Sequence, residues 1–370
     1  MRIAIINTLS VPSGNASVNR FLGYGKELAR LGVEVDVLTS ARCEDCEIDG
    51  VIVTSCGNGS SMFGALRRIT KRVRKGEYDA AILISNSLLL IYPLCLACKL
   101  GNVKFLQEKS EFPFVLMKKG FVHKLYAKFY VNTTYRLFDG LIVMTKPLMD
   151  YFKDKVRKGC KLLEMPMTVD TERFAIEKTD SEYGNYIAYC GNMAGNKDGV
   201  LNLIEAFNIA SPKIGDVKLL LIGGSSNQED WDRIVETVKQ TGNQNIVMFG
   251  KATREQMPAL LKNAKALALA RPSSLQSTGG FPTKLGEYLA TGNPVIVTAV
   301  GDIPQYLNET NAFVVKADDN YMFAAAIEKV FADYEQAVEI GKRGQDLAQT
   351  VFSSKEQSKR LYKYLENVCE

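Results

Sequence analysis

The sequence predicts an α/β protein with two Rossmann-like domains, each built on a doubly wound parallel sheet. Three observations predict this fold class. The chain has 370 residues, which is more than one hydrophobic core usually holds. Short apolar segments of strand length alternate with helical segments along most of the chain. A turn-rich, polar stretch after residue 165 separates one such series from the next.

The first elements predict a βαβ unit. The apolar run Arg2 to Ile6 leads through a loop into a helical segment, which either Ser17 or Asn19 is predicted to cap. The helix stops at Gly32, and Val33 to Val37 alternates as a strand does. Such a crossover is right-handed and makes its two strands parallel, so the loop after the first strand opens at the carboxyl edge of the sheet.

The later elements follow the same rhythm. Helices with amphipathic spacing are expected near residues 319–350 and 354–368. The predicted domains are residues 1–165 and 166–350, and a helix at 351–370 is expected to return to the first domain. The strands are expected at 51–53, 80–84, 103–106 and 140–144 in the first sheet, and at 186–190, 217–222, 245–249, 266–270 and 294–298 in the second.

Composition and charge narrow the functional classes. Hydrophobic residues make up 46% and charged residues 24%, which excludes a disordered or fibrous chain. Met1 runs directly into a strand without a signal peptide, so we expect a cytoplasmic protein whose eight cysteines stay reduced. Residues 1–165 hold 25 Lys and Arg against 15 Asp and Glu. This excess suits a phosphate-bearing ligand or an anionic membrane, and equally a set of solvated helices; a nucleic-acid partner is not expected.

Two features suggest a metal or a membrane span, and neither is expected to be one. The pairs Cys43/Cys46 and Cys95/Cys98 have zinc-ligand spacing, but the second pair lies in an apolar stretch where cysteine packs as a small hydrophobe. The apolar stretch from Ala80 to Leu100 is interrupted by Ser85-Asn86-Ser87, which indicates a strand, a turn and a helix.

The segment from Pro272 to Thr298 carries the most chemical information. Gly279-Gly280 allows backbone N–H groups to approach a ligand closely, and Thr283 is predicted to cap the following helix. The helix start and the Lys284 ammonium suit a diphosphate, and the Glu287 carboxylate suits a pair of vicinal sugar hydroxyls. A capped helix with a solvated lysine and glutamate explains the same residues equally well.

This segment resembles the donor-binding motif of the family-4 retaining glycosyltransferases of GT-B fold. The motif has a Pro-Ser strand end, two glutamates eight residues apart around Gly-Phe, and a closing Ala-x-Gly-x-Pro-Val. The matching residues are Pro272-Ser273, Gly280-Phe281, Glu287, Ala290, Gly292 and Pro294-Val295.

The resemblance extends over nearly the whole chain. The loop around Gly14 is similar to the family's glycine loop after the first strand. Residues 166–174 resemble the family's domain junction, and residues 189–200 resemble its Gly-Arg-Leu…Lys-Gly segment, with Lys197 at the lysine that binds the donor diphosphate. Three departures stand out: Gly279 replaces the first motif glutamate, Asn192 replaces an arginine, and the strand-end histidine of the first domain is missing.

The resemblance implies a glycosyltransferase that moves a sugar from a nucleotide-diphosphate sugar to a glycan or lipid-linked acceptor, with retention and without a metal or other cofactor. No Asp-x-Asp metal motif occurs. Lys284 is expected to supply the charge that Asn192 lacks. Lys197, Lys284 and Glu287 are the expected catalytic residues. The expected donor contacts are Gly14, Gly191, Asn192, Lys197, Gly279, Gly280, Phe281, Thr283, Lys284 and Glu287.

The acceptor side is open to more than one interpretation. Glu108, Glu111 and His123 are its candidate residues. The segment from Lys118 to Tyr130 mixes cations and aromatics, which suits a helix lying on anionic lipid at the inner face of the cell membrane, or a helix with a core-facing aromatic stripe. A nucleotide-sugar 2-epimerase and a non-catalytic nucleotide-sugar-binding protein are the alternative functions.

Overall fold

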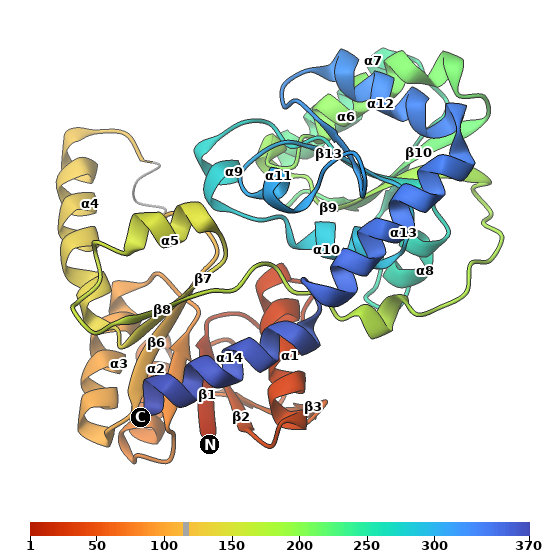
Figure 1. The fold of residues 1–370 in the computed structure, drawn as a ribbon. Helices are drawn as coiled ribbons and strands as arrows, with labels where there is room; N and C mark the ends of the chain where they lie inside the picture. The colour runs from red at the N-terminus through yellow and green to blue at the C-terminus, as the bar shows by residue number, and fades with distance from the viewer. Residues whose placement is uncertain (114–117) are drawn as a thin grey trace. The chain divides into compact units, whose positions relative to one another are not determined.

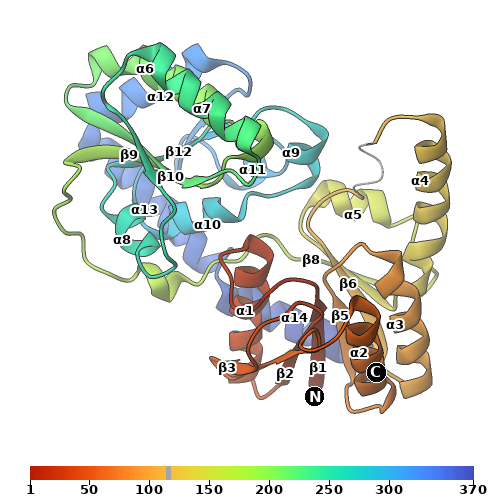
Figure 2. The ribbon, with the colours of Figure 1, turned by 180° about the vertical axis from the view of Figure 1, so that it is seen from behind.

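The chain forms two compact units. The computed structural model describes residues 1–113 and 118–370. Unit 1 consists of Met1–Thr168 together with Ser354–Glu370, and unit 2 is Val169–Ser353. Figures 1 and 2 trace the path: the chain passes from unit 1 into unit 2 once and returns with its last helix.

Unit 1 is built on an eight-stranded sheet with the order β3-β4-β2-β1-β5-β6-β7-β8. All pairs are parallel except β3 with β4, so the predicted α/β fold class is confirmed for this half. The sequence reading missed β3 and β8. The strands are β1 Arg2–Asn7, β2 Glu34–Thr39, β3 Cys46–Ile48, β4 Val51–Ser55, β5 Ala80–Leu83, β6 Lys104–Lys109, β7 Gly140–Val143 and β8 Lys161–Glu164.

Helices cover the sheet of unit 1. The predicted cap of its first helix was wrong, because the Asn15 side chain accepts a hydrogen bond from Ser17 N at 2.9 Å and the helix begins at Ala16. The stretch from Ala80 to Leu100 forms β5, a turn and α3. No helix among the described residues is both long and apolar enough to span a bilayer. The helices are α1 Ala16–Arg30, α2 Met62–Arg74, α3 Leu88–Gly101, α4 Phe121–Thr134 and α5 Lys146–Phe152.

The last helix, α14 (Ser354–Cys369), completes the core of unit 1. Leu361 and Leu365 are fully buried in the cluster that contains Ile3 and Ile5 of β1. The Tyr364 hydroxyl donates to the backbone oxygen of Lys161 at 2.8 Å, which ties α14 to β8. Unit 1 is therefore assembled from two pieces of chain that are far apart in the sequence.

Unit 2 has a six-stranded, fully parallel sheet with the order β11-β10-β9-β12-β13-β14. This is the Rossmann order, in which the strand order reverses between the first and fourth strands, here β9 and β12. The strands are β9 Asn185–Asn192, β10 Val217–Gly224, β11 Ile246–Gly250, β12 Ala266–Leu269, β13 Val295–Thr298 and β14 Phe313–Val315.

The helices of unit 2 include one break that the periodicity did not reveal. The amphipathic stretch 319–350 is two helices, because Asp333 accepts from Gln336 N at 3.1 Å and starts a new helix there. The helices are α6 Val200–Ala210, α7 Gln228–Thr241, α8 Met257–Lys262, α9 Leu275–Gly279, α10 Thr283–Ala290, α11 Ile303–Tyr306, α12 Asn320–Ala332 and α13 Tyr334–Thr350.

Candidate functional site

The candidate site lies in unit 2, at the carboxyl ends of β9 and β12. Open parallel sheets bind ligands where the strand order reverses, because the loops there diverge to opposite faces of the sheet. The loop after β9 runs from Met193 to Gly199, and the loop after β12 leads through α9 to α10. The Tyr288 hydroxyl of α10 accepts from Cys190 N at 2.7 Å, which fixes α10 against the end of β9.

Two glycines let the chain pack closely at this point. Gly191 has φ of 145°, and a Cβ atom there would collide with the Lys284 ammonium. Gly199 has φ of 70°, and its Cβ atom would collide with the backbone oxygen of Ala270. Both positions therefore require glycine for space as well as for backbone conformation. The Lys284 ammonium therefore lies against the end of β9, at Gly191.

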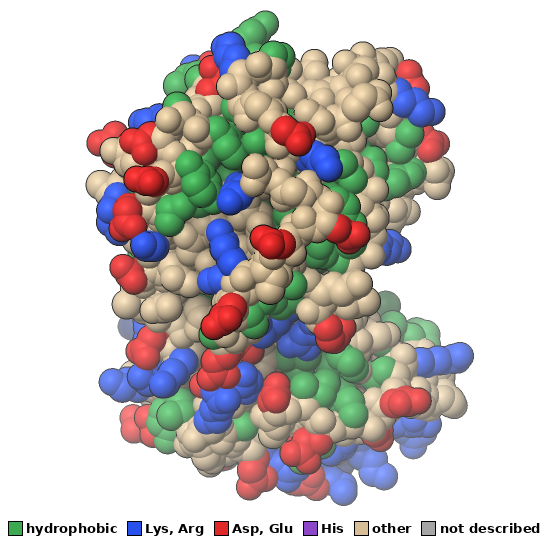
Figure 3. Space-filling model, turned by 90° about the vertical axis from the view of Figure 1, so that its right-hand side faces the viewer, with side chains coloured by type: hydrophobic (Ala, Val, Ile, Leu, Met, Phe, Trp, Pro, Cys, Tyr) green, Lys and Arg blue, Asp and Glu red, His purple; other side chains and the backbone are tan. Residues whose placement is uncertain are grey.

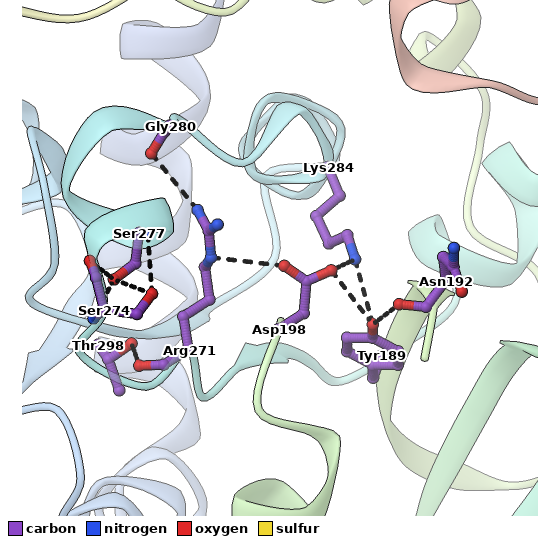
Figure 4. Close-up of polar contacts among 9 residues, drawn as sticks. All are labelled: Tyr189, Asn192, Asp198, Arg271, Ser274, Ser277, Gly280, Lys284 and Thr298. Atoms are coloured by element: carbon purple, nitrogen blue, oxygen red, sulfur yellow. Dashed lines mark hydrogen bonds and ion pairs between the residues drawn. The ribbon is translucent and has the colours of Figure 1, made fainter. Parts of the chain in front are cut away.

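Lys284 is buried and held by a carboxylate that the sequence reading missed. Its Nζ donates to Asp198 Oδ2 at 2.5 Å and to the Tyr189 hydroxyl at 3.2 Å (Figure 4). Burial by itself lowers the pKa of Lys284, but Tyr189 and Asp198 outweigh it and leave that pKa raised. The ammonium is therefore charged at neutral pH.

Asp198 also faces a second buried cation, Arg271. Arg271 Nε lies 3.4 Å from Asp198 Oδ1, and the arginine side chain is 1% exposed. Burial favours the neutral form of Asp198, yet Lys284 and Arg271 together lower its pKa. Two cations thus share one carboxylate, as Figure 4 shows, and the group of Asp198, Lys284 and Arg271, here called the charge cluster, has a net charge of +1.

The turn between β12 and α10 is rigidly built. Ser274 and Ser277 form reciprocal hydrogen bonds, with Ser277 N to Ser274 Oγ at 3.0 Å and Ser274 N to Ser277 Oγ at 2.8 Å. Gly279 is the last residue of α9, and the Gly280 oxygen lies 3.5 Å from Arg271 Nη1. The Phe281 ring is buried against Phe352, so this residue can offer a ligand only its backbone.

The predicted cap at Thr283 was wrong. Thr283 is itself the first residue of α10, the N-cap is Pro282, and no side chain caps this end. The helix starts one residue earlier than expected, so the threonine hydroxyl is past the position from which it could accept from the first N–H groups. An uncapped N-terminus beside two buried cations suits an anion.

Glu287 lies one turn further along α10 and has a partner from the junction segment. Arg173 Nη1 lies 3.2 Å from Glu287 Oε1, and Arg173 Nη2 donates to the Arg254 oxygen at 3.0 Å. Burial raises the pKa of Glu287, and Arg173 opposes that effect. Arg173 belongs to the short 3-10 helix Thr171–Phe174, and the sequence reading gave it no role.

The other predicted donor residues take different places. Asn192 ends β9, and its Oδ1 accepts from Ala194 N at 3.0 Å, which shapes the loop. Lys197 is half-buried next to Asp198 and helps to lower the pKa of that carboxyl. Gly14 lies in unit 1, in the loop before α1, where a Cβ atom would meet no neighbour.

The three acceptor candidates in unit 1 lie on separate elements. The Glu108 side chain of β6 is 7% exposed and accepts from Arg20 Nε at 2.5 Å and from the Tyr24 hydroxyl at 2.9 Å, so its oxygens are already committed. Glu111 is half-buried in the loop after β6, and His123 is exposed on α4. The sequence did not reveal that Glu108 pairs with Arg20 of α1.

Lys109, the last residue of β6, is a second buried lysine. Its Nζ donates to Asn86 Oδ1, and the side chain has almost no exposure. Burial lowers the pKa of Lys109 to about 7, with Glu111 opposing the effect only in part. Within the described ranges, no group of three or more His, Cys, Asp or Glu side chains is arranged to hold a metal ion, and all eight cysteines are free.

Comparison with known proteins agrees with this architecture. Residues 184–333 match the family model described as "Glycosyl transferases group 1". No curated protein sequence matches the chain significantly.

Solved structures with the same fold match nearly the full chain. A sucrose-phosphate synthase from Thermosynechococcus elongatus superposes with a TM-score of 0.75 at 18% identity, covering 99% of this chain and 98% of that one. Anabaena Alr3699/HepE in complex with UDP-glucose gives 0.76 at 14% identity, with 99% and 100% covered. WaaG, a glycosyltransferase involved in lipopolysaccharide biosynthesis, gives 0.70 at 14% identity, with 99% of both chains covered.

Proposed function

We propose that this protein transfers a sugar from a nucleotide-diphosphate sugar to a glycan or lipid-linked acceptor. The proposal is supported by its GT-B fold and by the match of residues 184–333 to the glycosyl transferases group 1 family. The proposal includes retention of the anomeric configuration and independence of a metal ion. It also places the reaction in the cytoplasm, in the assembly of a surface polysaccharide.

The observation that carries the proposal is the charge cluster at the ends of β9 and β12. Lys284 and Arg271 are two buried cations that face the same carboxylate, that of Asp198. A diphosphate bound beside the uncapped start of α10 would lie close to both of them. Fixed charges in a water-poor site stabilise a leaving group strongly, because they need no reorganisation during the reaction.

We propose the following bond changes at this site. The bond between the sugar C1 and the diphosphate oxygen breaks, and its electron pair stays on the diphosphate beside Lys284. A hydroxyl oxygen of the acceptor bonds to C1 on the same face, and its proton passes to the departing diphosphate oxygen. Lys197, half-buried next to Asp198, adds positive charge on the leaving-group side.

Glu287 supplies the second contact that a nucleotide needs. Two vicinal ribose hydroxyls can donate to one carboxylate, and Arg173, at 3.2 Å, orients the Glu287 carboxylate and opposes the rise of its pKa by burial. Structures of Anabaena Alr3699/HepE with UDP, and with UDP and glucose, have the same fold as this chain, which supports a nucleotide-sugar as the ligand class.

The test starts with binding. A thermal-shift screen with UDP-, GDP- and ADP-sugars should find one nucleotide series that raises the melting temperature, because a ligand bound only by the folded state stabilises it. The same series should bind in calorimetry in the presence of EDTA. Failure of every series would contradict the proposal, and binding that requires a divalent cation would contradict its metal-independent form.

Measurements of turnover distinguish a transferase from a non-catalytic nucleotide-sugar-binding protein. The latter is the main alternative because glycine stands at position 279 and asparagine at position 192. The preferred donor should be hydrolysed slowly without acceptor, and NMR of the released sugar before it equilibrates should show the anomer of the donor. Tight binding with no hydrolysis and no transfer to any glycan or lipid-linked acceptor would favour the non-catalytic alternative. Release of a C2-inverted sugar would favour the epimerase.

A further inference from the structure

Helix α4 buries one face and exposes an apolar one. Ala127, Tyr130 and Val131 pack inward, and the Tyr130 hydroxyl donates to the Asn86 oxygen at 3.1 Å. The opposite face carries large apolar side chains in water: Phe121 at 83% exposure, Val122 at 74%, Leu125 at 63%, Tyr126 at 40% and Phe129 at 54%. Because the inner face is anchored, the outer face is presented to solvent by the fold itself.

Helix α3 has the same division. Leu90, Ile91 and Leu94 are buried against the rest of unit 1. Leu89, Tyr92, Leu96 and Leu100 follow one another at spacings of three, four and four residues, so they form one stripe along the helix. Each of these four side chains is at least 40% exposed.

The two exposed faces are joined. The Tyr92 hydroxyl of α3 lies 3.2 Å from the Thr133 hydroxyl of α4. Figures 1 and 2 show both helices along the same outer side of unit 1. Among the described residues, 17 large hydrophobic side chains are exposed, and nine of them belong to α3 and α4. Single exposed apolar residues are ordinary, but such a concentration marks a binding surface. We call these nine side chains the apolar strip.

The charges around the apolar strip are predominantly positive. Helices α2, α3 and α4 contain eight Lys and Arg and no Asp or Glu, and α2 packs against α3. Residues 62–158 hold 19 Lys and Arg against seven Asp and Glu. By contrast, the face drawn in Figure 3 shows acidic and basic side chains side by side.

A groove adjoins α4 on the side where its lysines lie. It encloses about 340 Å³ and is lined by Lys118, Lys124 and Lys128, with Tyr151 of α5 and the flank of α4. Three ammonium groups around a groove of this size suit a phosphate headgroup. The groove and the apolar strip are neighbours on α4, so one ligand with an anionic head and an apolar body would use both.

We propose that the face formed by α3 and α4 docks unit 1 on an anionic phospholipid bilayer. The apolar strip would lie at the boundary between headgroups and acyl chains, and the lysines of the groove would contact headgroup phosphates. Amphipathic helices with aromatic and aliphatic side chains on one face and lysines at its margin lie in the plane of such an interface. The long lysine side chains reach the phosphates while their stems stay on the apolar surface. The proposal goes beyond sugar transfer and does not depend on it.

The test is flotation of the full chain with vesicles. The protein should float with vesicles of phosphatidylcholine and phosphatidylglycerol, and much less with phosphatidylcholine alone. Leu125→Ser with Phe129→Ser, and separately Lys124→Gln with Lys128→Gln, should each reduce the bound fraction about tenfold. Leu96→Ser with Leu100→Ser should weaken binding as well, because α3 shares the surface.

Matched controls lie in unit 2. Tyr321→Ser with Met322→Ser removes two exposed apolar side chains, and Lys239→Gln with Lys342→Gln removes two exposed lysines; both double variants should float like the unchanged protein. Equal losses in the controls, or no flotation of the unchanged protein, would overturn the proposal. So would a dimer in light scattering that the Leu125/Phe129 variant abolishes without any vesicle binding, because the apolar strip would then join two copies. Nucleotide-sugar binding should stay unchanged in all variants, so this test and the test of the proposed function fail separately.

Discussion

Each unit buries a lysine at the carboxyl edge of its sheet, and the surroundings shift the pKa values of the two lysines in opposite directions. Lys109 Nζ of unit 1 donates to the Asn86 amide oxygen and lies 5.7 Å from the centre of the Tyr135 ring, and burial lowers its pKa to about 7. Lys284 of unit 2 meets the Asp198 carboxylate at 2.5 Å, and its pKa is raised despite similar burial. Burial alone discharges an ammonium group, whereas a carboxylate in contact keeps it charged.

The comparison teaches what Asp198 contributes to the candidate site. Without it, two buried cations would repel each other, and burial would lower the pKa of Lys284 in the direction seen for Lys109. With it, the site keeps a lasting positive charge in a place where water is scarce. Asp198 is therefore a positioning residue for Lys284 and Arg271, and the following changes would break or sharpen the contrast with Lys109.

The largest effect is expected from Asp198→Asn, which should make Lys284 resemble Lys109. Removing one partner of a buried charge group leaves the others uncompensated, so unit 2 should lose about 3–5 kcal/mol of unfolding free energy. Urea unfolding followed by the fluorescence of Trp231, the only tryptophan, reports on unit 2. Asp180→Asn, on an exposed residue before β9, is the control and should change little.

The same variant has a signed pH dependence. The folded pKa of Asp198 lies below the ordinary 3.8, so its stabilisation is complete above that value and is lost as the pH falls through the folded pKa. The stability difference between the unchanged protein and Asp198→Asn should therefore shrink in acid. It should also shrink as the pH rises above neutral, because Lys284 of the variant sheds its proton there and the cost of burying its charge disappears. A difference that grows in acid would contradict the charge assignment.

The next largest effect is expected on donor affinity. Lys284→Met removes the ammonium and leaves Asp198 paired with Arg271. Losing a charged hydrogen bond to a diphosphate should cost about 3 kcal/mol, roughly a hundredfold in Kd measured by calorimetry. Lys239→Met on α7 is the control. Equal affinities in both variants would remove Lys284 from the donor site.

Lys109→Met should stabilise unit 1, in contrast to the variants of unit 2. The cost of burying Lys109 is complete below its folded pKa of about 7 and disappears as the pH rises toward the ordinary value of 10.5. Methionine should therefore raise the unfolding free energy by about 2 kcal/mol at pH 7, with a smaller gain toward pH 10. Circular dichroism during urea unfolding measures it, and a gain that increases with pH would contradict the assignment.

The smallest effect is expected from Arg173→Gln. Arg173 lowers the pKa of Glu287 against the effect of burial, so its loss should raise that pKa further. Donor affinity should fall by about 1 kcal/mol at neutral pH and fall further on mild acidification, because a protonated carboxyl accepts ribose hydroxyls poorly. Arg173→Lys should restore part of the affinity. If the pH dependence of donor affinity is the same in Arg173→Gln as in the unchanged protein, Arg173 does not control the ionisation of Glu287.

The central strands of both sheets could be predicted from the sequence, but the edge strands could not. Buried strands such as Tyr186 to Cys190 are continuous apolar runs, which local pattern reveals. The edge strands β3, β8 and β14 are short and partly exposed, so they lack that signal. The first helix was placed correctly, but three nearby residues can act as caps, and only the loop geometry selects Asn15.

The site was predictable where a motif carries it and not where it depends on contacts between distant residues. Lys284 and Glu287 were singled out from their segment and remain candidates, whereas Asp198 and Arg271 meet across 73 residues of sequence. One signal was available, because Arg271 follows the apolar run of β12 directly and a charge at the end of a buried strand is unusual. Glu108 was misleading for the same reason, since its partner Arg20 is 88 residues away.

The return of α14 to unit 1 sets the order in which the protein can mature on the ribosome. The chain of unit 2 is synthesised completely before the helix that contributes Leu361 and Leu365 to the core of unit 1. Unit 2 can therefore finish folding first. Until α14 is synthesised, the sheet of unit 1 keeps an apolar face exposed to solvent. Truncations after residue 353 should thus damage the N-terminal half of the protein and spare the half next to the cut.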